Sequence, residues 1–157
     1  MMTAILNIAT RSAKRQPMVL LDSALVTCEF GVENDFRGKP GKRQVTVLDN
    51  KSWQEACNIL GKKIEWQTRR ANILVSDLNL ENTAGCYLLM GELVLQITQE
   101  TDPCKRMEEY EPGLFNALKD HWRGGVCCQV IREGKIKIGD KVKLITKEEY
   151  ETEKQRK

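Results

Sequence analysis

One cysteine in this chain stands in a setting that could give its thiol a chemical role. Cys104 follows Pro103 and precedes Lys105 and Arg106, just after the apolar run 93–98. The thiolate is the form of cysteine that acts as a nucleophile or binds a soft metal, and adjacent cations favour it. Because proline restricts its own backbone and that of the preceding residue, the thiol lies on a stiffened connection. A small buried thiol at a strand end is the alternative interpretation.

The other five cysteines have weaker claims to chemistry. No two of the six cysteines have C-x-x-C spacing, which gives little support to a zinc ribbon or a thioredoxin-type motif. Cys57 falls on the apolar face of an expected helix, and Cys28 ends an apolar run, so both are predicted to be packed core thiols. Cys127 and Cys128 are adjacent in an expected strand and must point to opposite faces. They are therefore poor partners for one metal ion.

Two stretches could bind an anion. Residues 31–43 contain three glycines, one proline and four cations, so backbone N–H groups and side chains together can hold an anionic group. A solvated surface loop is the other interpretation of this composition. Arg69 and Arg70 beside Asn72 can orient a phosphate or carboxylate, or can form an exposed strand edge. On a strand, the two arginines would point to opposite faces.

Size and charge limit the class of protein. A chain of 157 residues with a net charge of +3 is expected to form one domain over residues 1–146, followed by a charged tail over 147–157 that is a frayed helix or disordered. The mild basicity suits anionic ligands but does not by itself indicate nucleic-acid binding. The N-terminus lacks a cationic region followed by a long apolar one, and no apolar run approaches the length of a membrane span. These features predict a cytoplasmic protein with reduced thiols and no membrane partner.

The hydrophobic pattern indicates a mainly β fold of the α+β class. Strands are expected over residues 4–9, 17–21, 24–26, 44–48, 73–75, 125–131 and within 136–145, and residues 85–98 should form two strands that bend at Gly91. One helix is expected over 51–60, between a cap at Asp49 or Asn50 and a stop at Gly61, and a short one over 112–120. Without βαβ alternation, an antiparallel-rich β-barrel with a few short helices is predicted. Similar glycine-acid corners at Gly91 and Gly139 suit a closed or nearly closed barrel.

Five short motifs occur in an order that resembles one known family. They are Gly31 to Asp35 leading to Arg43-Gln-Val-Thr, Arg70-Ala-Asn-Ile73, Asp102-Pro-Cys104, Arg123-Gly-Gly125, and Gly134-Lys-Ile-Lys-Ile-Gly-Asp140. Each motif alone is weak, but the series resembles the MOSC domains, which are named for the C-terminal domain of molybdenum cofactor sulfurases. The resemblance spans about residues 5–145 and is closest to stand-alone MOSC proteins.

The resemblance implies a fold, a cofactor and a role for one residue. The fold would be a β-barrel of the pyruvate kinase type, and the cofactor would be molybdenum cofactor. Cys104 matches the cysteine that is thought either to carry transferable sulfur or to ligate molybdenum. Longer relatives reduce N-hydroxylated compounds at that metal. This chain lacks the desulfurase and iron–sulfur domains of larger relatives, so the resemblance implies an external sulfur or electron donor.

The first motif departs from the family pattern. Asn34-Asp35 stands where a Gly-Asp pair is usual, and Phe36-Arg37 stands where a His commonly follows. No role of that His is therefore carried over to this chain. The missing His also leaves open that the thiol site is vestigial.

An anionic pterin phosphate needs cations and polar groups around the thiolate. The candidates for holding the phosphate are Arg37, Arg43, Arg69, Arg70 and Arg132, of which Arg70 occupies a motif position. Asp35 and Asn72 could position a pterin amide or a metal-bound oxo group, or could serve only turn and strand-end hydrogen bonds. His121, beside Trp122 at an expected helix end, is predicted to be a surface residue.

Two functions of different classes remain. The first is a molybdenum-cofactor-binding protein that uses Cys104 as a sulfur carrier or metal ligand, with or without reduction of small N-hydroxylated substrates; whether it is an enzyme stays open. The second is a non-catalytic β-barrel module that binds anions or nucleic acid, suggested by the basic loop and Arg69-Arg70. Only 6% of residues are aromatic, which leaves few stacking platforms and argues against nucleic acid.

Overall fold

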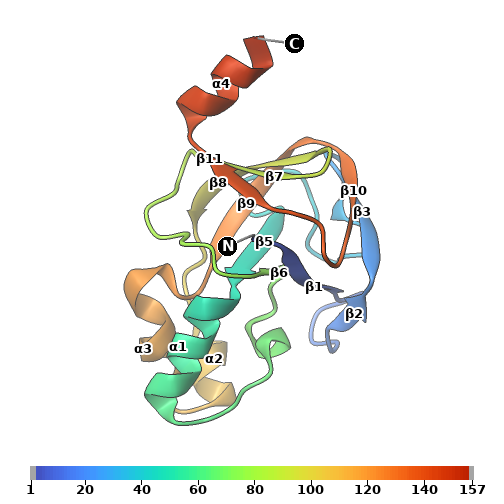
Figure 1. Cartoon of the computed structure of the whole chain (residues 1–157). Helices are drawn as coiled ribbons and strands as arrows, with labels where there is room; N and C mark the ends of the chain where they lie inside the picture. Colours follow the sequence, from blue (N-terminus) through green and yellow to red (C-terminus); the bar gives the residue numbers. More distant parts are fainter. Residues whose placement is uncertain (1–2, 156–157) are drawn as a thin grey trace.

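The structure is a computed structural model that describes residues 3–155 (Figure 1). The strands are β1 (Ile5–Thr10), β2 (Val19–Leu21), β3 (Ser23–Thr27), β4 (Gly31–Val32), β5 (Val45–Asp49), β6 (Ile73–Val75), β7 (Tyr87–Met90), β8 (Leu93–Glu100), β9 (Val126–Arg132), β10 (Gly134–Lys137) and β11 (Lys143–Ile145). The α-helices are α1 (Asn50–Leu60), α2 (Lys105–Tyr110), α3 (Leu114–Lys119) and α4 (Lys147–Gln155), with 3-10 helices η1 (Trp66–Arg69) and η2 (Asp120–Trp122).

The strands form one large mixed sheet and one small sheet. The eight-stranded sheet has the order β11-β7-β8-β9-β5-β6-β1-β2, and β10-β3-β4 form the second sheet. Every pair in both sheets is antiparallel except β5 with β6, which is parallel. The prediction of a mainly β, antiparallel-rich fold with a few short helices is therefore confirmed.

Two topological expectations were wrong. β5, α1 and β6 form a βαβ unit, because a parallel pair needs a crossover connection and residues 50–72 supply it. The expected closed barrel of the pyruvate kinase type is not found, since no ladder between the described residues joins the edge strands β2 and β11. The chain before β11 instead touches the start of β1, where Ala4 forms an isolated bridge with Lys141.

Helix α1 begins and ends where the sequence predicts. The Asp49 carboxylate accepts hydrogen bonds from the backbone N–H groups of Lys51 and Ser52, which would otherwise lack partners at a helix start. Gly61 ends the helix in the left-handed conformation that glycine adopts without steric cost. Asp49 also accepts from the Leu78 N–H and thereby ties the helix start to the segment after β6.

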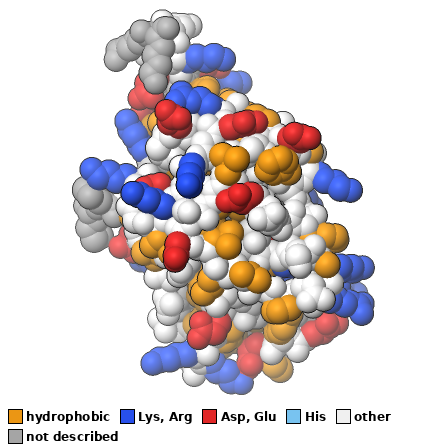
Figure 2. All heavy atoms as spheres, turned by 90° about the vertical axis from the view of Figure 1, so that its right-hand side faces the viewer, with side chains coloured by type: hydrophobic (Ala, Val, Ile, Leu, Met, Phe, Trp, Pro, Cys, Tyr) orange, Lys and Arg blue, Asp and Glu red, His pale blue; other side chains and the backbone are white. Residues whose placement is uncertain are grey.

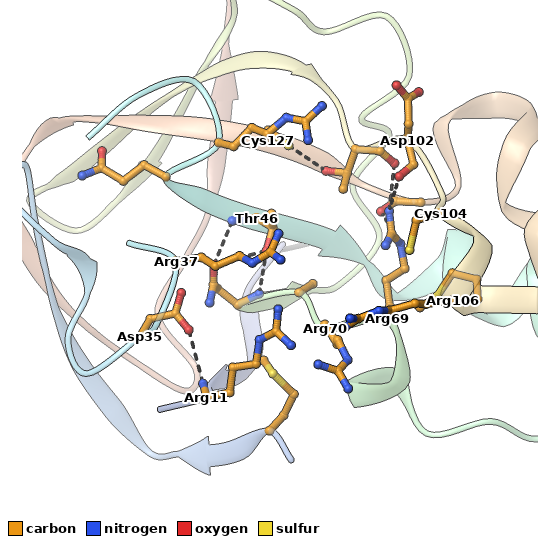
Figure 3. A pocket seen from close by; sticks show the side chains of 18 of the residues that line it. Arg11, Asp35, Arg37, Thr46, Arg69, Arg70, Asp102, Cys104, Arg106 and Cys127 are labelled. Carbon is orange, nitrogen blue, oxygen red and sulfur yellow. Dashed lines mark hydrogen bonds between the residues drawn. The ribbon is translucent and has the colours of Figure 1, made fainter. Parts of the chain in front are cut away.

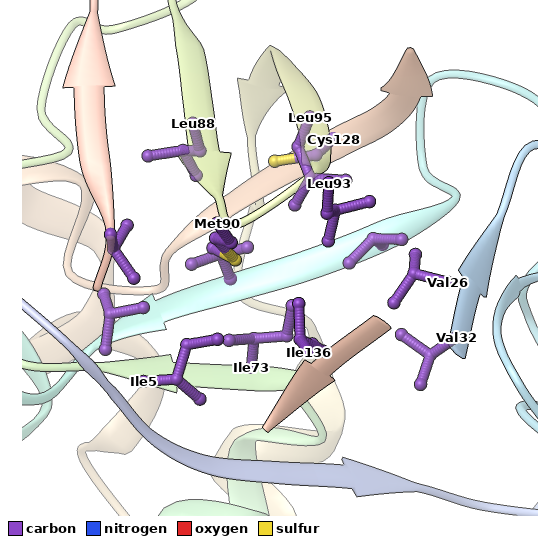
Figure 4. Close-up of a cluster of buried hydrophobic side chains, with 14 of the residues drawn as sticks. Ile5, Val26, Val32, Ile73, Leu88, Met90, Leu93, Leu95, Cys128 and Ile136 are labelled. Atoms are coloured by element: carbon purple, nitrogen blue, oxygen red, sulfur yellow. The ribbon is translucent and has the colours of Figure 1, made fainter. Parts of the chain in front are cut away.

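The main core fills the space enclosed by the two sheets (Figure 4). Alternation along the strands decides which side chains enter it: Val45 and Val47 on β5 face this core, whereas Leu48 faces the helices. On β9, Cys128 lies fully buried in the main core. Burial raises the pKa of the Cys128 thiol far above its ordinary value, so this cysteine is an inert packing residue.

A second core joins the helices to the opposite face of the large sheet. Trp53 and Cys57 of α1 pack there with Met107 of α2 and Leu118 of α3, which confirms the prediction that Cys57 is a core thiol. Figure 1 shows these three helices gathered at one end of the molecule, while α4 projects from the other end. This arrangement places the connections between strands and helices together at one edge of the sheet.

The C-terminal charged segment forms helix α4 over the residues that the structure describes, in agreement with the helical alternative. Its Tyr150 ring stacks on Tyr87 of β7 with centroids 4.0 Å apart. On the face shown in Figure 2, hydrophobic side chains alternate with charged ones instead of forming one patch. Between residues 3 and 155, no helix has both the length and the apolar character needed to cross a membrane.

Candidate functional site

A cavity of about 500 Å³ opens at the edge where helices and sheet meet. Among residues 3–155 its lining is strongly cationic, with eight Lys and Arg side chains and only two carboxylates, Asp35 and Asp102. The cations are Arg11, Lys14, Arg37, Arg43, Arg69, Arg70, Lys105 and Arg106. Figure 3 shows the guanidinium groups of Arg11, Arg37 and Arg70 directed toward a common space, with Cys104 and Arg69 to one side. Such an excess of positive charge favours an anionic occupant.

Cys104 lies on this cavity wall immediately before helix α2. Its side chain is exposed, and its carbonyl accepts a hydrogen bond from the Met107 N–H in the first turn of the helix. Because Met107 is buried in the helical core, α2 anchors the backbone next to the thiol. The thiol is thus accessible while its backbone is fixed. All six cysteines are free.

Arg69 holds the backbone that carries Cys104. Its Nη2 donates to the carbonyl oxygens of Thr101 at 2.9 Å and Asp102 at 3.5 Å, and its Nε donates to the Gly124 carbonyl at 3.0 Å. Burial lowers the pKa of the guanidinium from its ordinary value, whereas the nearby Cys104, Cys127 and Asp102 oppose that change. Arg69 is therefore a buried cation that joins both ends of the 101–125 connection.

Close packing around Arg69 explains a glycine in the Arg-Gly-Gly motif. A side chain at Gly124 would place its Cβ 2.7 Å from the Thr101 carbonyl oxygen and 3.0 Å from Nη2 of Arg69. Both distances are shorter than ordinary contacts, so only glycine lets the backbone approach the guanidinium so closely. Gly124 thus permits the Arg69 clamp, by which we mean the hydrogen bonds from Arg69 to the carbonyl oxygens of Thr101, Asp102 and Gly124.

A second thiol lines the cavity, on β9. Cys127 is buried, and its Sγ lies 3.3 Å from the Thr101 hydroxyl. The prediction that Cys127 and Cys128 point to opposite faces is confirmed, because Cys128 lies in the main core. The expectation for Cys28 was wrong: its side chain is exposed, since the chain turns outward after β3.

The polar residues opposite Cys104 are held by hydrogen bonds across three strands. The Asn72 side-chain oxygen accepts from the Thr46 N–H at 3.0 Å, and its amide donates to the Ala9 carbonyl at 3.2 Å. Asp35 accepts from the Arg11 N–H at 3.2 Å. Asn72 therefore joins β1, β5 and β6, as the strand-end interpretation predicted, and Asp35 ties the 33–44 loop to the end of β1.

Burial raises the pKa of the Asp35 carboxyl above its ordinary value of 3.8, although a hydrogen bond from Asn72 opposes the change. A raised pKa means that the folded state favours the protonated acid, so the stabilisation is present below pH 3.8 and is lost as the pH rises through the folded pKa. We expect Asp35→Asn to remove this loss, so that the variant gains stability relative to the parent as the pH rises. Urea unfolding of both proteins between pH 3 and 7 measures it; a pH-independent difference would contradict the assignment.

Two guanidinium nitrogens in the cavity lack hydrogen-bond partners. Nη1 of Arg11 and Nη1 of Arg70 are buried and make no hydrogen bond within residues 3–155. Buried polar groups are normally paired, and an unpaired one is costly. An anionic ligand with several acceptor oxygens would supply the missing partners. The donor set therefore fits a phosphate-bearing ligand.

The structure brings together most of the residues singled out from the sequence. Asp35, Arg37, Arg43, Arg70, Asn72 and Cys104 all line the cavity. Arg132 does not, because it lies five residues beyond Cys127 on β9, or about 16 Å along an extended strand. His121 is exposed as predicted and contacts Glu81.

Other cavity residues were not identified from the sequence. Arg11 ends in the cavity after β1, and Thr46 and Cys127 reach it from neighbouring strands. From the sequence, Arg69 was expected on a strand, either as a ligand for a phosphate or carboxylate or as part of an exposed strand edge. The chain instead forms η1 there, and Arg70 follows it in the left-handed conformation with φ of 65°. The strand-alternation argument for the two arginines was therefore wrong, although the doubled Arg was the right signal.

Comparison with known proteins identifies the family of this chain. The model of the MOSC domain family matches residues 30–143, and the chain belongs to this family. No curated protein matches the sequence.

Solved structures show the same fold. YuaD from Bacillus subtilis aligns with a TM-score of 0.77 at 21% identity, over 92% of this chain and 97% of that one. YiiM from Geobacillus stearothermophilus aligns with a TM-score of 0.72 at 15% identity, over 91% and 75% of the two chains. YiiM from Escherichia coli also gives 0.72, at 16% identity, over 93% and 70%. At these identities the likeness extends to the fold alone.

Proposed function

We propose that the cavity binds molybdenum cofactor and that Cys104 is the residue that reacts with sulfur or ligates the metal. The observation that carries the proposal is the position of one accessible thiol among eight cations, two of which have buried guanidinium nitrogens with no hydrogen-bond partner in the residues that the structure describes. Membership of the MOSC family, which is associated with molybdenum cofactor sulfurase-type proteins, supports the same ligand.

The residues present fit the chemistry of this cofactor. Arg11, Arg37 and Arg70 would hold its phosphate, because guanidinium forks match phosphate oxygens. Asn72 and Thr46 offer polar groups for the pterin edge, although their hydrogen bonds to strands also hold the wall. When bound, the cofactor supplies a metal centre that can exchange electrons in pairs. The cofactor brings its own dithiolene ligands, so Cys104 need add only one thiolate.

The protein alone does not assemble a conventional metal site around this thiol. Within residues 3–155, no group of three or more His, Cys, Asp or Glu side chains is placed to hold an ion. The proposal requires none, because a single thiolate completes a metal that already carries other ligands. Arg69 would fix the position of that thiolate through the Thr101 and Asp102 carbonyls.

Two versions of the Cys104 role make different demands on a partner. As a sulfur carrier, the Cys104 thiolate would attack the terminal sulfur of a donor persulfide; a new S–S bond forms at Cys104 while the donor leaves as a thiolate. As a metal ligand in a reductase, it would remain unmodified while an external donor supplies two electrons. Reduction of an N-hydroxylated compound with two protons then releases the amine and water.

The decisive experiment compares Cys104→Ser with Cys28→Ser after expression in a molybdate-replete host. Cys28 is an exposed thiol outside the cavity, so its replacement controls for loss of a surface cysteine. We expect molybdenum and pterin to copurify with the parent and with Cys28→Ser, and the metal content to fall at least tenfold in Cys104→Ser. Equal molybdenum in all three proteins would overturn the role of Cys104 as a ligand.

Intact mass after incubation with a cysteine desulfurase and cysteine separates the two versions. Sulfur carriage predicts one added sulfur atom on the parent and on Cys28→Ser, and none on Cys104→Ser. Metal ligation predicts molybdenum without that added mass. If neither molybdenum nor added sulfur depends on Cys104, but anions still bind, the chain is the non-catalytic anion-binding module instead.

A further inference from the structure

A second hollow adjoins the Cys104 cavity and shares part of its wall. This outer basin has a volume of about 730 Å³ and is more open than the inner cavity. Lys14, Arg37 and Arg43 line both spaces. Because three cations are common to the two, one ligand can extend from the inner cavity into the outer basin without crossing an uncharged gap.

The outer basin contains more positive charge than one phosphate needs. Lys39 and Lys42 join the three shared cations, and no carboxylate from the described part of the chain lines the basin. All five of these side chains are exposed, and none of them forms a salt bridge with another residue of the 3–155 range. A second anionic group is the expected occupant of such a surface.

Phe36 adds an aromatic platform to this basic surface. Phe36 is 41% exposed and lines the outer basin. Its backbone N–H donates to the Arg11 carbonyl at 2.8 Å, and the Arg11 guanidinium lies 5.8 Å from the ring centroid. The ring is thus held at its backbone and partly covered by a cation, while the exposed part can stack on a planar base. In this chain, Phe36 occupies the position after the Asp of the first motif.

We propose that the outer basin binds a nucleoside diphosphate group, with the base against Phe36 and the diphosphate among Lys39, Lys42 and the shared cations. The proposal deepens the proposed function and rests on it for the inner occupant: the full ligand would be a dinucleotide form of the pterin cofactor. The carboxylates of an acidic polypeptide could pair with the lysines but would not stack on the exposed ring beside them. The aromatic ring therefore favours a nucleotide.

Calorimetric titration with ADP, GDP, CDP and inorganic pyrophosphate tests the base and the diphosphate separately. We expect at least one nucleotide to bind roughly tenfold more tightly than pyrophosphate, because a base that stacks on an aromatic ring adds affinity that pyrophosphate cannot gain. Phe36→Leu should abolish this advantage while leaving pyrophosphate binding unchanged. Phe30→Leu is the matched control, since Phe30 is similarly exposed but lies outside both hollows.

The double variant Lys39→Gln/Lys42→Gln should weaken nucleotides and pyrophosphate alike, by roughly tenfold, because both lysines lie in the outer basin only. Lys135→Gln/Lys137→Gln on β10 controls for the change in net charge. Equal affinity for nucleotides and pyrophosphate, or no response to Phe36→Leu, would overturn the proposal. A third result would also overturn it: a poly-glutamate peptide displaces every nucleotide and binds Phe36→Leu as tightly as it binds the parent. That result would instead identify a surface for acidic polypeptides.

The result is independent of the Cys104 experiment. Nucleotide binding should be unchanged in Cys104→Ser, because the thiol does not line the outer basin. If the cofactor copurifies but no nucleotide binds, only the outer-basin proposal is contradicted. If nucleotides bind but neither molybdenum nor added sulfur depends on Cys104, only the proposed function is contradicted.

Discussion

Replacement of Arg69 by Met should lower the free energy of unfolding by about 3 kcal/mol, because the buried Gly124 carbonyl and the partly buried Thr101 carbonyl, at the two ends of the 101–125 connection, lose their donor. Each unsatisfied buried group costs about 1–3 kcal/mol, and the apolar replacement cannot compensate. Urea unfolding with a shared m-value measures the change. The guanidinium is buried, so screening by solvent does not reduce the effect as it would at a surface site.

Two further variants separate the Arg69 clamp from simple loss of charge. Arg70→Met removes the neighbouring cation, whose Nη2 bonds the exposed Tyr110 hydroxyl, and should cost less than about 1 kcal/mol. Arg69→Lys keeps the charge but cannot place two donors in a fixed fork, so we expect most of the loss to remain. If Arg69→Lys is as stable as the parent, the positive charge alone accounts for the stabilisation and the fixed fork of guanidinium donors is not required.

The clamp also predicts a change at the thiol. In Arg69→Met, the rate of Cys104 alkylation by iodoacetamide should change while Cys28 reacts as before, because only Cys104 lies on the backbone that Arg69 holds. Peptide mass analysis resolves the two cysteines. An unchanged ratio of the two rates in a destabilised variant would show that Arg69 serves stability only.

Gly38→Ala should be comparably damaging, with a loss of about 3 kcal/mol. A Cβ at this position would overlap the Phe30 carbonyl oxygen and would lie 2.6 Å from its carbon, both of them backbone atoms that cannot move aside cheaply. The buried Gln44 side chain donates to the Gly38 carbonyl at 3.2 Å, so the shift would also disturb that contact. Because Arg37 and Arg43 lie on this loop, pyrophosphate affinity should fall together with stability.

Gly41→Ala is the control within the same loop. Gly41 has φ of 142°, but nothing lies within 4 Å of a Cβ placed there. The substitution should therefore cost about 1 kcal/mol from backbone strain. Because Gly41 itself lines the outer basin, pyrophosphate binding should weaken, but less than in Gly38→Ala. Thermal unfolding and calorimetry on the two variants provide the comparison. Equal losses at both positions would mean that loop strain, and not the close approach at Gly38, controls the site.

The sequence singled out Cys104, the exposed thiol of the candidate site, but not the residues that hold it in place. Cys104 could be recognised because proline and two cations surround it locally and because it sits in a family motif. Arg69 could not be assigned its role, since its partners Thr101 and Gly124 lie more than thirty residues away. Periodicity reports which face a residue shares with its neighbours, and it carries no information about a distant carbonyl.

In the fold, too, features set by neighbouring residues could be predicted, whereas features set by residues distant in sequence could not. The ends of α1 were predictable because Asp49 and Gly61 act within one turn of the helix. The parallel pairing of β5 with β6 was not, because three residues, Ile73 to Val75, look alike in either direction of pairing. Closure of a barrel likewise depends on whether two edge strands meet, which short alternating segments leave undetermined. Arg132 was wrongly predicted to hold the phosphate for a related reason: its charge does not tell how far along β9 it lies from the cavity.

The order of strands in the large sheet has a consequence for how fast the site can form. β1 pairs with β6, as in Ile8 with Ile73, and β5 pairs with β9, as in Val47 with Val126, so central ladders join segments that are distant in sequence. Closing such long loops costs entropy before any contact compensates, and chains with this topology fold in milliseconds to seconds. The cavity is lined by residues that lie on β5 and β9, directly after β1 and directly before β6, so all four strands must be in place to form it. We therefore expect it to appear only in the last step of folding, so that any ligand meets a finished site and does not guide its assembly.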